Sequence, residues 1–442
     1  MSEGKKSSKI AIGTFVVGLL IGLVVMYAAA PSMGLTSSSS SAMTVTMTAS
    51  GAAASGLSGT ITIGDLVALT GDLSAYGQRS KNAVDMAIAD INTWLASSGS
   101  TVQFAVTHED TATDPATCLQ KLQTLAAQGI QVYVGPMTSA EVRNVLSYAD
   151  TNQLVLISQS STAADLGNRT NSFLFRFVPT DFAQSKAVAR TVYQYGIQDV
   201  IVIARHDTWG DGLSAAIEAR FTQLGGNIID SIQYTPVSSG TYDFSAQLTQ
   251  MQSDYSTAVA KYGASKVGII AVSFDELSVI YQQLSSYPAL TKSVWFGTDG
   301  TAQSSTVAST AGSTAASVKS LSTIYAPTRG DKYAAFTSAY VAKYGGAPDA
   351  YAYSAYDAAW VAALSILAVG KNSGAAVQKV LISVANNYYG VAGWPDLNAN
   401  GDRTIADYDV WEIQATNATS FGWVNVGTWS ASSDSVAYTM SP

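Results

Sequence analysis

Short, almost wholly apolar runs alternate with amphipathic segments along most of this chain. Between Tyr76 and Leu95, apolar side chains recur at the three-to-four-residue spacing of one helix face. The apolar runs predict strands at 61–69, 102–106, 132–135, 154–157, 198–204, 227–234, 267–272 and 293–297. Strands that are apolar on both faces and alternate with helices are typical of parallel sheets with helices on both sides. The pattern therefore predicts an α/β fold.

The alternation forms two successive runs that are joined near residues 177–179, which indicates two lobes. Within the runs, helices are predicted around Cys118 and at 139–150, 211–224, 244–262 and 275–286. Helical patterns return later in the chain, at 331–344, 353–369 and 375–388. Two short strands follow them and predict a hairpin, at 410–413 and 422–427.

Two of the strands run directly into clusters of small hydroxylic residues, within the segment 131–166. Each cluster predicts a helix start, because Thr138 and Glu141 have the spacing of a capping box. Thr162 and Asp165 form the acidic variant of the same motif. Helix N-termini carry free N–H groups and a partial positive charge. We therefore expect the two paired helix starts to bind a small anion, such as the carboxylate of a ligand.

Ligands of open α/β sheets bind beyond the carboxyl ends of the strands. In this sequence those ends lie at residues 71–76, 137–139, 158–162, 205–209, 273–275 and 298–300. Together they supply hydroxyl groups, aromatic faces and one or two acids. Such a set suits an amino-acid-like zwitterion, with helix N-termini for its carboxylate and an aspartate for its ammonium group.

The N-terminus has the pattern of a membrane anchor. Three lysines within the first nine residues precede the uncharged stretch Ile10–Ala30, which as a helix is long enough to cross a bilayer core of about 30 Å. The positive-inside rule then places the rest of the chain outside the cytoplasm. A cleaved signal peptide is the alternative, since Ala28–Ala30 fits a cleavage site. Residues 1–35 are thus expected to form an anchor or signal segment, and the Ser/Thr/Ala-rich residues 36–56 a flexible linker.

The composition argues against several classes of function. The formal net charge of −8 over 442 residues argues against nucleic-acid binding, which depends on Lys and Arg. Cys118 is the only cysteine, so no intrachain disulfide exists, and we expect it to be a small buried side chain. His108 and His206 are the only histidines and lie in different predicted lobes, with no nucleophile motif near them. We therefore expect no enzymatic activity, no cofactor and no metal centre.

Ten short segments occur in the order in which a known family has them, at 69–78, 110–118, 134–139, 156–166, 175–184, 204–213, 241–248, 296–300, 353–359 and 400–413. They include LTGDLSAYGQ, LISQSSTAADL, FRFVPTDFAQ and NGDRTIADYDVWEI. Through them, the body of the chain resembles the substrate-binding proteins of branched-chain amino acid ABC transporters, of the Leu/Ile/Val-binding type. The resemblance implies a periplasmic-binding-protein-like fold of type I, with two Rossmann-like lobes that have parallel sheets and are joined by a three-crossover hinge. The implied lobes are residues 57–178 with 326–393, and residues 179–325 with 394–442.

The resemblance also implies which residues hold the two charged ends of the ligand. Ser139 and Thr162 match the residues that bind the α-carboxylate, and Ser160 belongs to the same hydroxylic cluster. Asp299 matches the acid of the second lobe that pairs with the ammonium group. Amino-acid binders of the family often have glutamate there, so the shorter side chain implies an ammonium group closer to the second lobe or bridged by water.

Three aromatic residues match positions that border the ligand's side chain in the family. Tyr76 comes from the first lobe, and Phe274 lines the pocket from the second. Trp209 occupies a position that is usually tyrosine, so it fills more volume and offers an indole N–H in place of a hydroxyl.

These observations predict an extracytoplasmic solute-binding protein that captures a small amino acid or related amide and delivers it to an ABC permease. A ligand-sensing module of a receptor, and a surface protein that binds no solute, are the alternatives.

Residues 396–407 fit the spacing of a calcium loop, but they lack the two flanking helices, so we expect a hairpin turn there. Asn168 and Asn417 lie in sequons that would accept glycans on an exported chain.

Overall fold

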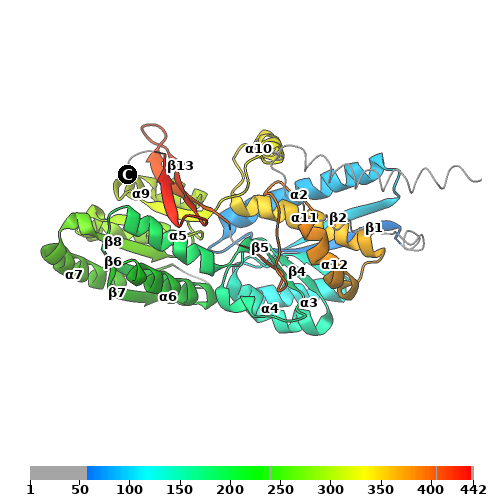
Figure 1. Ribbon diagram of the computed structural model, residues 1–442, viewed down its shortest axis with the longest axis horizontal. Coiled ribbons are helices and arrows are strands. Elements are labelled where there is room, and N and C mark those ends of the chain that lie inside the picture. Colours follow the sequence, from blue (N-terminus) through cyan, green and yellow to red (C-terminus); the bar gives the residue numbers. More distant parts are fainter. Residues whose placement is uncertain (1–56, 238–240, 405, 440–442) are drawn as a thin grey trace, which may run out of the picture.

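The computed structural model describes residues 57–237, 241–404 and 406–439. Two lobes lie side by side along the long axis of the molecule, and each has a central sheet with helices against it (Figure 1). One sheet has six strands in the order β11-β5-β4-β3-β1-β2, and the other has eight in the order β14-β13-β12-β10-β9-β8-β6-β7. The predicted α/β architecture of two lobes with mainly parallel sheets is confirmed.

The first lobe is built from β1 (Gly59–Val67), α2 (Ser74–Ser97), β2 (Val102–Asp110), α3 (Pro115–Ala127), β3 (Val132–Val134), α4 (Ser139–Asn152), β4 (Val155–Ser158), η2 (Ala164–Gly167), β5 (Leu174–Pro179), α10 (Asp331–Tyr344), α11 (Ala350–Val369), α12 (Gly374–Asn386) and β11 (Asp402–Arg403). All neighbouring strands of its sheet pair in parallel. Cys118 on α3 is fully buried, as expected for a small core side chain.

The second lobe is built from α5 (Asp181–Gln194), β6 (Asp199–Arg205), α6 (Thr208–Gln223), β7 (Asn227–Tyr234), α7 (Ser245–Tyr262), η3 (Ala264–Lys266), β8 (Val267–Val272), α8 (Leu277–Gln283), η4 (Leu284–Ser286), η5 (Leu290–Lys292), β9 (Val294–Gly297), α9 (Ser305–Ser317), β10 (Leu321–Tyr325), β12 (Tyr408–Ala415), β13 (Phe421–Ser430) and β14 (Ser435–Tyr438). Strands β12 and β13 form the predicted antiparallel hairpin, which β14 extends by one strand.

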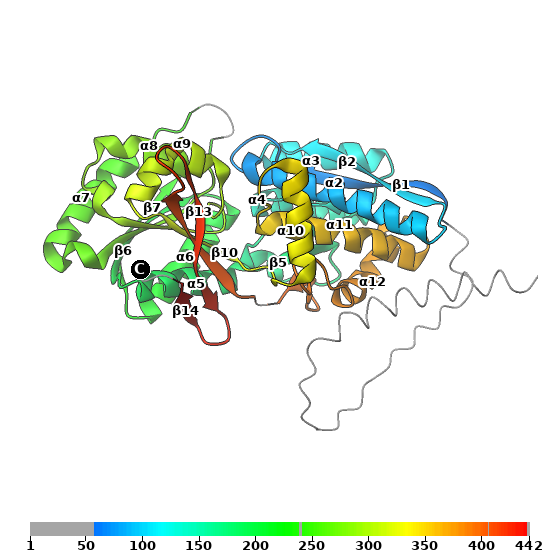
Figure 2. The same cartoon turned by 90° about the horizontal axis from the view of Figure 1, so that it is seen from above.

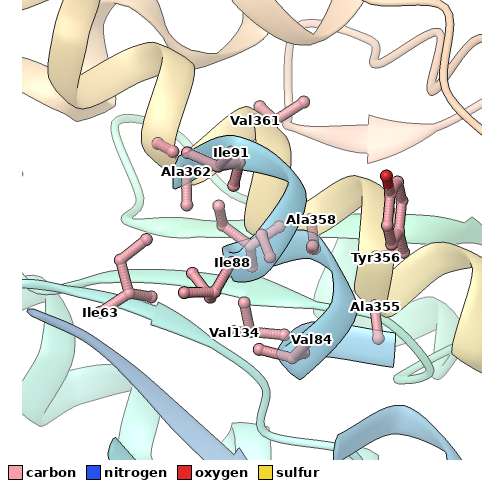
Figure 3. Packing of buried hydrophobic residues seen from close by; sticks show 14 of the residues in the cluster. Ile63, Val84, Ile88, Ile91, Val134, Ala355, Tyr356, Ala358, Val361 and Ala362 are labelled. Atoms are coloured by element: carbon pink, nitrogen blue, oxygen red, sulfur yellow. The ribbon is translucent and has the colours of Figure 1, made fainter. Parts of the chain in front are cut away.

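The core of the first lobe lies between its sheet and the packed helices α2 and α11. Ile88 and Ile91 on α2 meet alanines of α11, such as Ala358 and Ala362, whose small side chains let the two helices approach closely (Figure 3). Full burial of each isoleucine contributes about 1.5–3 kcal/mol. Helix α11 is long and apolar enough to cross a membrane, but 72% of its apolar 18-residue window is buried inside the protein, as in the core helix of a globular domain. Helix α10 lies over α2 on the outside of the same lobe (Figure 2).

The chain crosses between the lobes three times. The first crossing follows Pro179 at the end of β5, and the second follows Tyr325 at the end of β10. The third lies between Arg403 and Tyr408, since β11 pairs with β5 while β12 pairs with β10. The strand pairing thus places residues 402–403 in the first lobe, although the predicted boundary at 393/394 assigns them to the second.

The segment that fits the spacing of a calcium loop forms a turn. Asn398 Oδ1 accepts hydrogen bonds from the backbone N–H groups of Asn400 (2.9 Å) and Asp402 (3.1 Å), and Gly401 has a φ of +78°. The buried Asp402 carboxylate accepts from Arg169 (2.7 Å) and Arg176 (2.6 Å). These contacts confirm the predicted turn and tie it to the first lobe.

Six of the described α-helices and β-strands have no counterpart in the sequence prediction, namely β5, α5, α9, β10, β11 and β14. Helix α9 reads STVASTAGSTAAS, a composition close to that of the predicted linker, so its helical period is weak. The predicted helix start at Thr162 and Asp165 is wrong. Only the short 3₁₀ turn η2 follows there, with no side-chain cap, and Asp165 instead pairs with Arg143 on α4.

Candidate ligand-binding site

A small cavity lies between the lobes, at the carboxyl ends of strands from both sheets. Its lining residues are Leu73, Met137, Thr138, Ser139, Ser160, Thr162, Trp209, Phe274, Asp299, Gly300 and Tyr351. Six of the seven residues singled out from the sequence are among them, and Tyr76 is not. The cavity volume is about 20 Å³, which is room for about one water molecule. In this conformation the two lobes are closed on each other.

Tyr76 joins the lobes instead of lining the cavity. It is fully buried, and its hydroxyl donates a hydrogen bond to the backbone carbonyl of Ala302 at 2.7 Å. Its ring lies 5.7 Å from the ring of Tyr351, centroid to centroid, so it contacts a residue that does line the cavity. A role for Tyr76 in bordering the ligand itself stays a prediction.

The start of α4 forms the hydroxyl-rich side of the cavity. Thr138 caps this helix, because its hydroxyl accepts from the Glu141 N–H (3.0 Å) while Glu141 Oε2 accepts from the Thr138 N–H (2.8 Å). The predicted capping box is confirmed. Ser139 is the first helical residue, so the N–H groups around it have no partner within the helix. Its hydroxyl accepts from the Ala163 N–H (3.1 Å) and lies 3.0 Å from the hydroxyl of Ser161.

The second hydroxylic cluster is fastened to the first by short hydrogen bonds. The Ser160 hydroxyl donates to the carbonyl of Met137 at 2.8 Å, and the Ser158 hydroxyl donates to that of Pro136 at 2.6 Å. The Thr162 carbonyl accepts from the N–H of Asp181 at 2.8 Å, where the chain enters the second lobe. The cluster is therefore held in place by backbone contacts although no capped helix follows it.

Asp299 provides an acid from the second lobe. It follows β9, is buried, and its Oδ2 accepts from the hydroxyl of Tyr351 at 2.6 Å. Its Oδ1 is buried without a hydrogen-bond partner among the described residues. Burial raises the pKa of Asp299 to about 6, against the hydrogen bond from Tyr351 that lowers it. A cationic partner would satisfy Oδ1 and offset this desolvation.

A second acid near Asp299 was missed in the sequence. Asp181 begins α5, is buried, and neither of its carboxylate oxygens has a partner within the described part of the chain. Burial, and then the charge of Asp299, raise the pKa of Asp181 well above its usual value. The rule that polar residues follow strand ends would have found Asp181, had β5 been recognised as a strand.

The remaining wall of the cavity is aromatic. The rings of Trp209 and Phe274 are stacked, with centroids 4.7 Å apart and planes inclined by 24°. The start of α6 orients Trp209, since Asp207 Oδ1 accepts from the N–H groups of Trp209 (3.0 Å) and Gly210 (2.8 Å). Tyr351 completes the wall from α11, a helix on which sequence reasoning placed no site residue.

Further contacts hold the lobes together at the rim of the cleft. Asp72 of the first lobe accepts a hydrogen bond from the hydroxyl of Tyr242 at 2.6 Å, and its carbonyl accepts from the Asp275 N–H at 3.2 Å. Arg79 of the first lobe donates to the carbonyl of Gln303 at 3.0 Å. All three partners belong to the second lobe, so the closed arrangement has polar contacts outside the cavity as well as within it.

Comparison with known proteins identifies relatives over nearly the whole described body. The family model described as "Receptor family ligand binding region" matches residues 79–416. An uncharacterised protein of Methanocaldococcus jannaschii is 34% identical over 85% of this chain and 91% of its own length. A Leu/Ile/Val-binding protein of Rhizobium johnstonii is 28% identical over 48% of this chain and 57% of its own length. A leucine-binding protein of Thermotoga maritima superposes with a TM-score of 0.70 at 21% identity, covering 84% of this chain and 99% of that protein.

Proposed function

The chain belongs to the receptor ligand-binding-region family, and from that premise we propose that it is a solute-binding protein for a small amino acid or related amide. The expected resemblance to Leu/Ile/Val-type substrate-binding proteins of ABC transporters is confirmed. One observation carries the proposal. Groups suited to a carboxylate come from one lobe and an acid suited to an ammonium group comes from the other, and both line one cavity.

The carboxylate of the ligand would bind at the start of α4. Ser139 supplies a hydroxyl there, Thr162 a second, and the first-turn N–H groups of the helix favour a negative charge. Such charge-assisted hydrogen bonds are about twice as strong as those between neutral groups.

The ammonium group would bind Asp299 through the oxygen that has no partner within the described residues. None of the described residues that line the cavity is Lys or Arg. A ligand with an additional acidic side chain would therefore lack a cation to pair with, and burying an unpaired charge is costly. The site favours a zwitterion whose side chain is uncharged.

Binding would act by domain closure. A ligand that contacts Ser139 and Asp299 at once binds the closed form better than the open form, and so shifts the equilibrium towards closure. Because the closed cavity is no larger than about one water molecule, the lobes must part for a solute to enter. The three crossings of the chain form the hinge for that movement.

The printed names of relatives support an amino acid as the ligand and transport as the purpose. The Rhizobium protein is named for Leu/Ile/Val and the Thermotoga protein for leucine. We extend this to delivery of the solute to an ABC permease, with the body of the chain outside the cytoplasm. The proposed anchor Ile10–Ala30, or signal segment, lies outside the described residues. A sensing module of a receptor is the second candidate, favoured by the description of the matching family.

A calorimetric titration of the purified protein with the common amino acids and short amides tests the proposal. We expect saturable binding of at least one α-amino acid, at one molecule per chain. Absence of binding by every compound in the panel would contradict the proposal.

A further inference from the structure

We propose that the stacked pair Trp209 and Phe274, locked in place by Arg205, is a size filter that restricts the ligand to an amino acid with a small, uncharged side chain. Glycine, alanine and serine belong to this class, and the branched-chain amino acids do not. The proposal rests on the proposed function and specifies which ligands that site accepts. It is carried by three features of the cavity: where the aromatic pair lies, how little space it leaves, and what prevents it from moving.

The aromatic pair lies directly against the residue that follows Asp299. A Cβ atom placed on Gly300 would lie 2.6 Å from Phe274 Cδ1 and 3.0 Å from Trp209 Cη2. Together with the backbone carbonyl of Ser273, which would lie 2.5 Å from this Cβ, the two rings leave no room for a side chain at position 300. The volume beside the proposed ammonium site is therefore filled by protein. Substituents on the Cα of a bound amino acid must fit into what remains.

The space that remains is small. The closed cavity measures about 20 Å³, whereas pockets for drug-sized ligands measure about 300–1,000 Å³. Trp209 is 3% exposed and Phe274 is 5% exposed, so neither ring has free solvent behind it. Any amino acid therefore needs the lobes to part. We expect the side chain of leucine, unlike a methyl or hydroxymethyl group, also to require one of the two rings to move.

Arg205 opposes such a displacement. Its guanidinium carbon lies 3.9 Å from the centroid of the Phe274 ring, and Phe274 in turn stacks on Trp209. The guanidinium is itself held by three acids. Nη1 pairs with Glu276 at 2.6 Å and with Asp72 of the first lobe at 3.5 Å, and Nε pairs with Asp207 at 2.7 Å. Stacking of a desolvated guanidinium on an aromatic face is favourable and requires the flat geometry of arginine. Moving the pair would break this buried arrangement.

The acids that hold Arg205 are anchored as well. Glu276 is fully buried as a side chain and also accepts from the hydroxyl of Tyr234 at 2.6 Å. Asp207 is the residue that caps α6 and orients Trp209. Arg205 is thus a positioning residue: it does not line the cavity, and it acts on the ligand through the two rings.

The test is the ratio of dissociation constants for leucine and alanine, measured by calorimetry on wild type, Trp209→Ala and Arg205→Lys. We expect wild type to bind alanine at least about tenfold more tightly than leucine, since a few misplaced methylene groups cost that much or more. Trp209→Ala is expected to lower the ratio of the leucine Kd to the alanine Kd by about tenfold or more. Arg205→Lys keeps the positive charge but loses the flat guanidinium. It should lower the ratio of the leucine Kd to the alanine Kd, but by less than Trp209→Ala does. Arg190 pairs with Asp434 and does not line the cavity, so Arg190→Lys is the matched control and should leave the ratio unchanged.

Folding of each variant is checked by thermal denaturation, and Trp209→Tyr replaces Trp209→Ala if the latter does not fold. A wild-type protein that binds leucine as tightly as alanine overturns the size filter but leaves the proposed function standing. A ratio that stays at its wild-type value in both the Trp209 and the Arg205 variants also overturns the filter. Absence of binding by any amino acid overturns the proposed function, and the filter with it.

Discussion

The hydroxyl of Tyr351 donates a hydrogen bond to Asp299 Oδ2 over 2.6 Å, from the first lobe to the second. The hydroxyl of Tyr76 likewise donates to the backbone carbonyl of Ala302, so two tyrosines of the first lobe form hydrogen bonds with the segment that follows β9. The acid proposed to bind the ammonium group is therefore also a contact that holds the lobes together. Ligand binding and closure depend on the same carboxylate.

Ligand affinity is expected to fall in acid. Burial raises the pKa of Asp299 to about 6, and an ammonium group binds only the ionised carboxylate. Protons therefore compete with the ligand once the pH drops below about 6, and the Kd should rise by about tenfold for each further pH unit. Calorimetric titrations between pH 4.5 and pH 8 measure the effect, and a Kd that is constant across this range would contradict it.

Ser139→Ala should weaken ligand binding by about 10- to 100-fold, because a hydrogen bond to a charged group contributes about 1.5–3 kcal/mol. Isothermal titration measures the change. Ser309→Ala is the matched control, since that exposed hydroxyl contacts only the carbonyl of Thr306 within its own helix. If the two variants bind the ligand with the same Kd, Ser139 does not hold the carboxylate.

Tyr242→Phe should open the ligand-free protein. The change removes the hydroxyl that donates to Asp72 across the rim of the cleft, and leaves the ring in place. We expect a larger radius of gyration in small-angle X-ray scattering without ligand, and a Kd several-fold higher. Tyr287→Phe removes a hydroxyl that donates to Ser245 within the second lobe, and should leave the scattering curve unchanged. Identical curves for wild type and Tyr242→Phe would show that this contact does not favour closure.

His108 is expected to stabilise the first lobe in a pH-dependent way. Its Nδ1 lies 2.6 Å from Asp65 and its Nε2 lies 2.9 Å from Asp85. Burial lowers the pKa of His108, but the hydrogen bonds and charges of the two acids outweigh burial and raise it to about 9. Because this lies above the unfolded value of about 6.5, the contribution to stability is complete below pH 6.5 and is lost as the pH rises through 9.

His108→Asn should therefore lower the melting temperature by a few degrees at pH 6 and by much less at pH 9.5. The exposed His206, which pairs with Asp211 outside the core, provides the control variant His206→Asn. An equal loss at both pH values would mean that His108 acts by packing alone.

The elements found in the sequence are those whose burial leaves a local pattern. Strand β8 is apolar at all six positions and fully buried, and α2 has one long apolar face, so each is visible in a short window. Helix α9 packs against β12 and β13, and contacts with such distant segments leave no helical period in its own sequence. The helix start at Thr162 was wrong because a hydroxylic residue followed by an acid fits a capped helix and an ordinary turn equally well.

Some residues of the candidate site could be found from the sequence, and others could not. The strand-end rule and the family resemblance together placed Ser139, Thr162 and Asp299, and the fold brings all three to one cavity. Tyr351 could not be found by that rule, since it reaches the cavity from α11, a helix that returns to the first lobe after the second crossing. Asp181 was not predicted as a site residue because the strand before it, β5, was not recognised.

A zwitterion is proposed to bridge the lobes through Asp299. The most direct test is a calorimetric comparison of wild type and Asp299→Asn. Each is titrated with the amino acid that binds wild type best and with the same acid lacking its amino group. Asp331→Asn, at an exposed helix start in the first lobe, is the control. We predict that wild type prefers the amino acid, and that Asp299→Asn weakens its binding by about 30-fold or more and removes the preference. Equal affinity of wild type and Asp299→Asn for the amino acid would contradict the account.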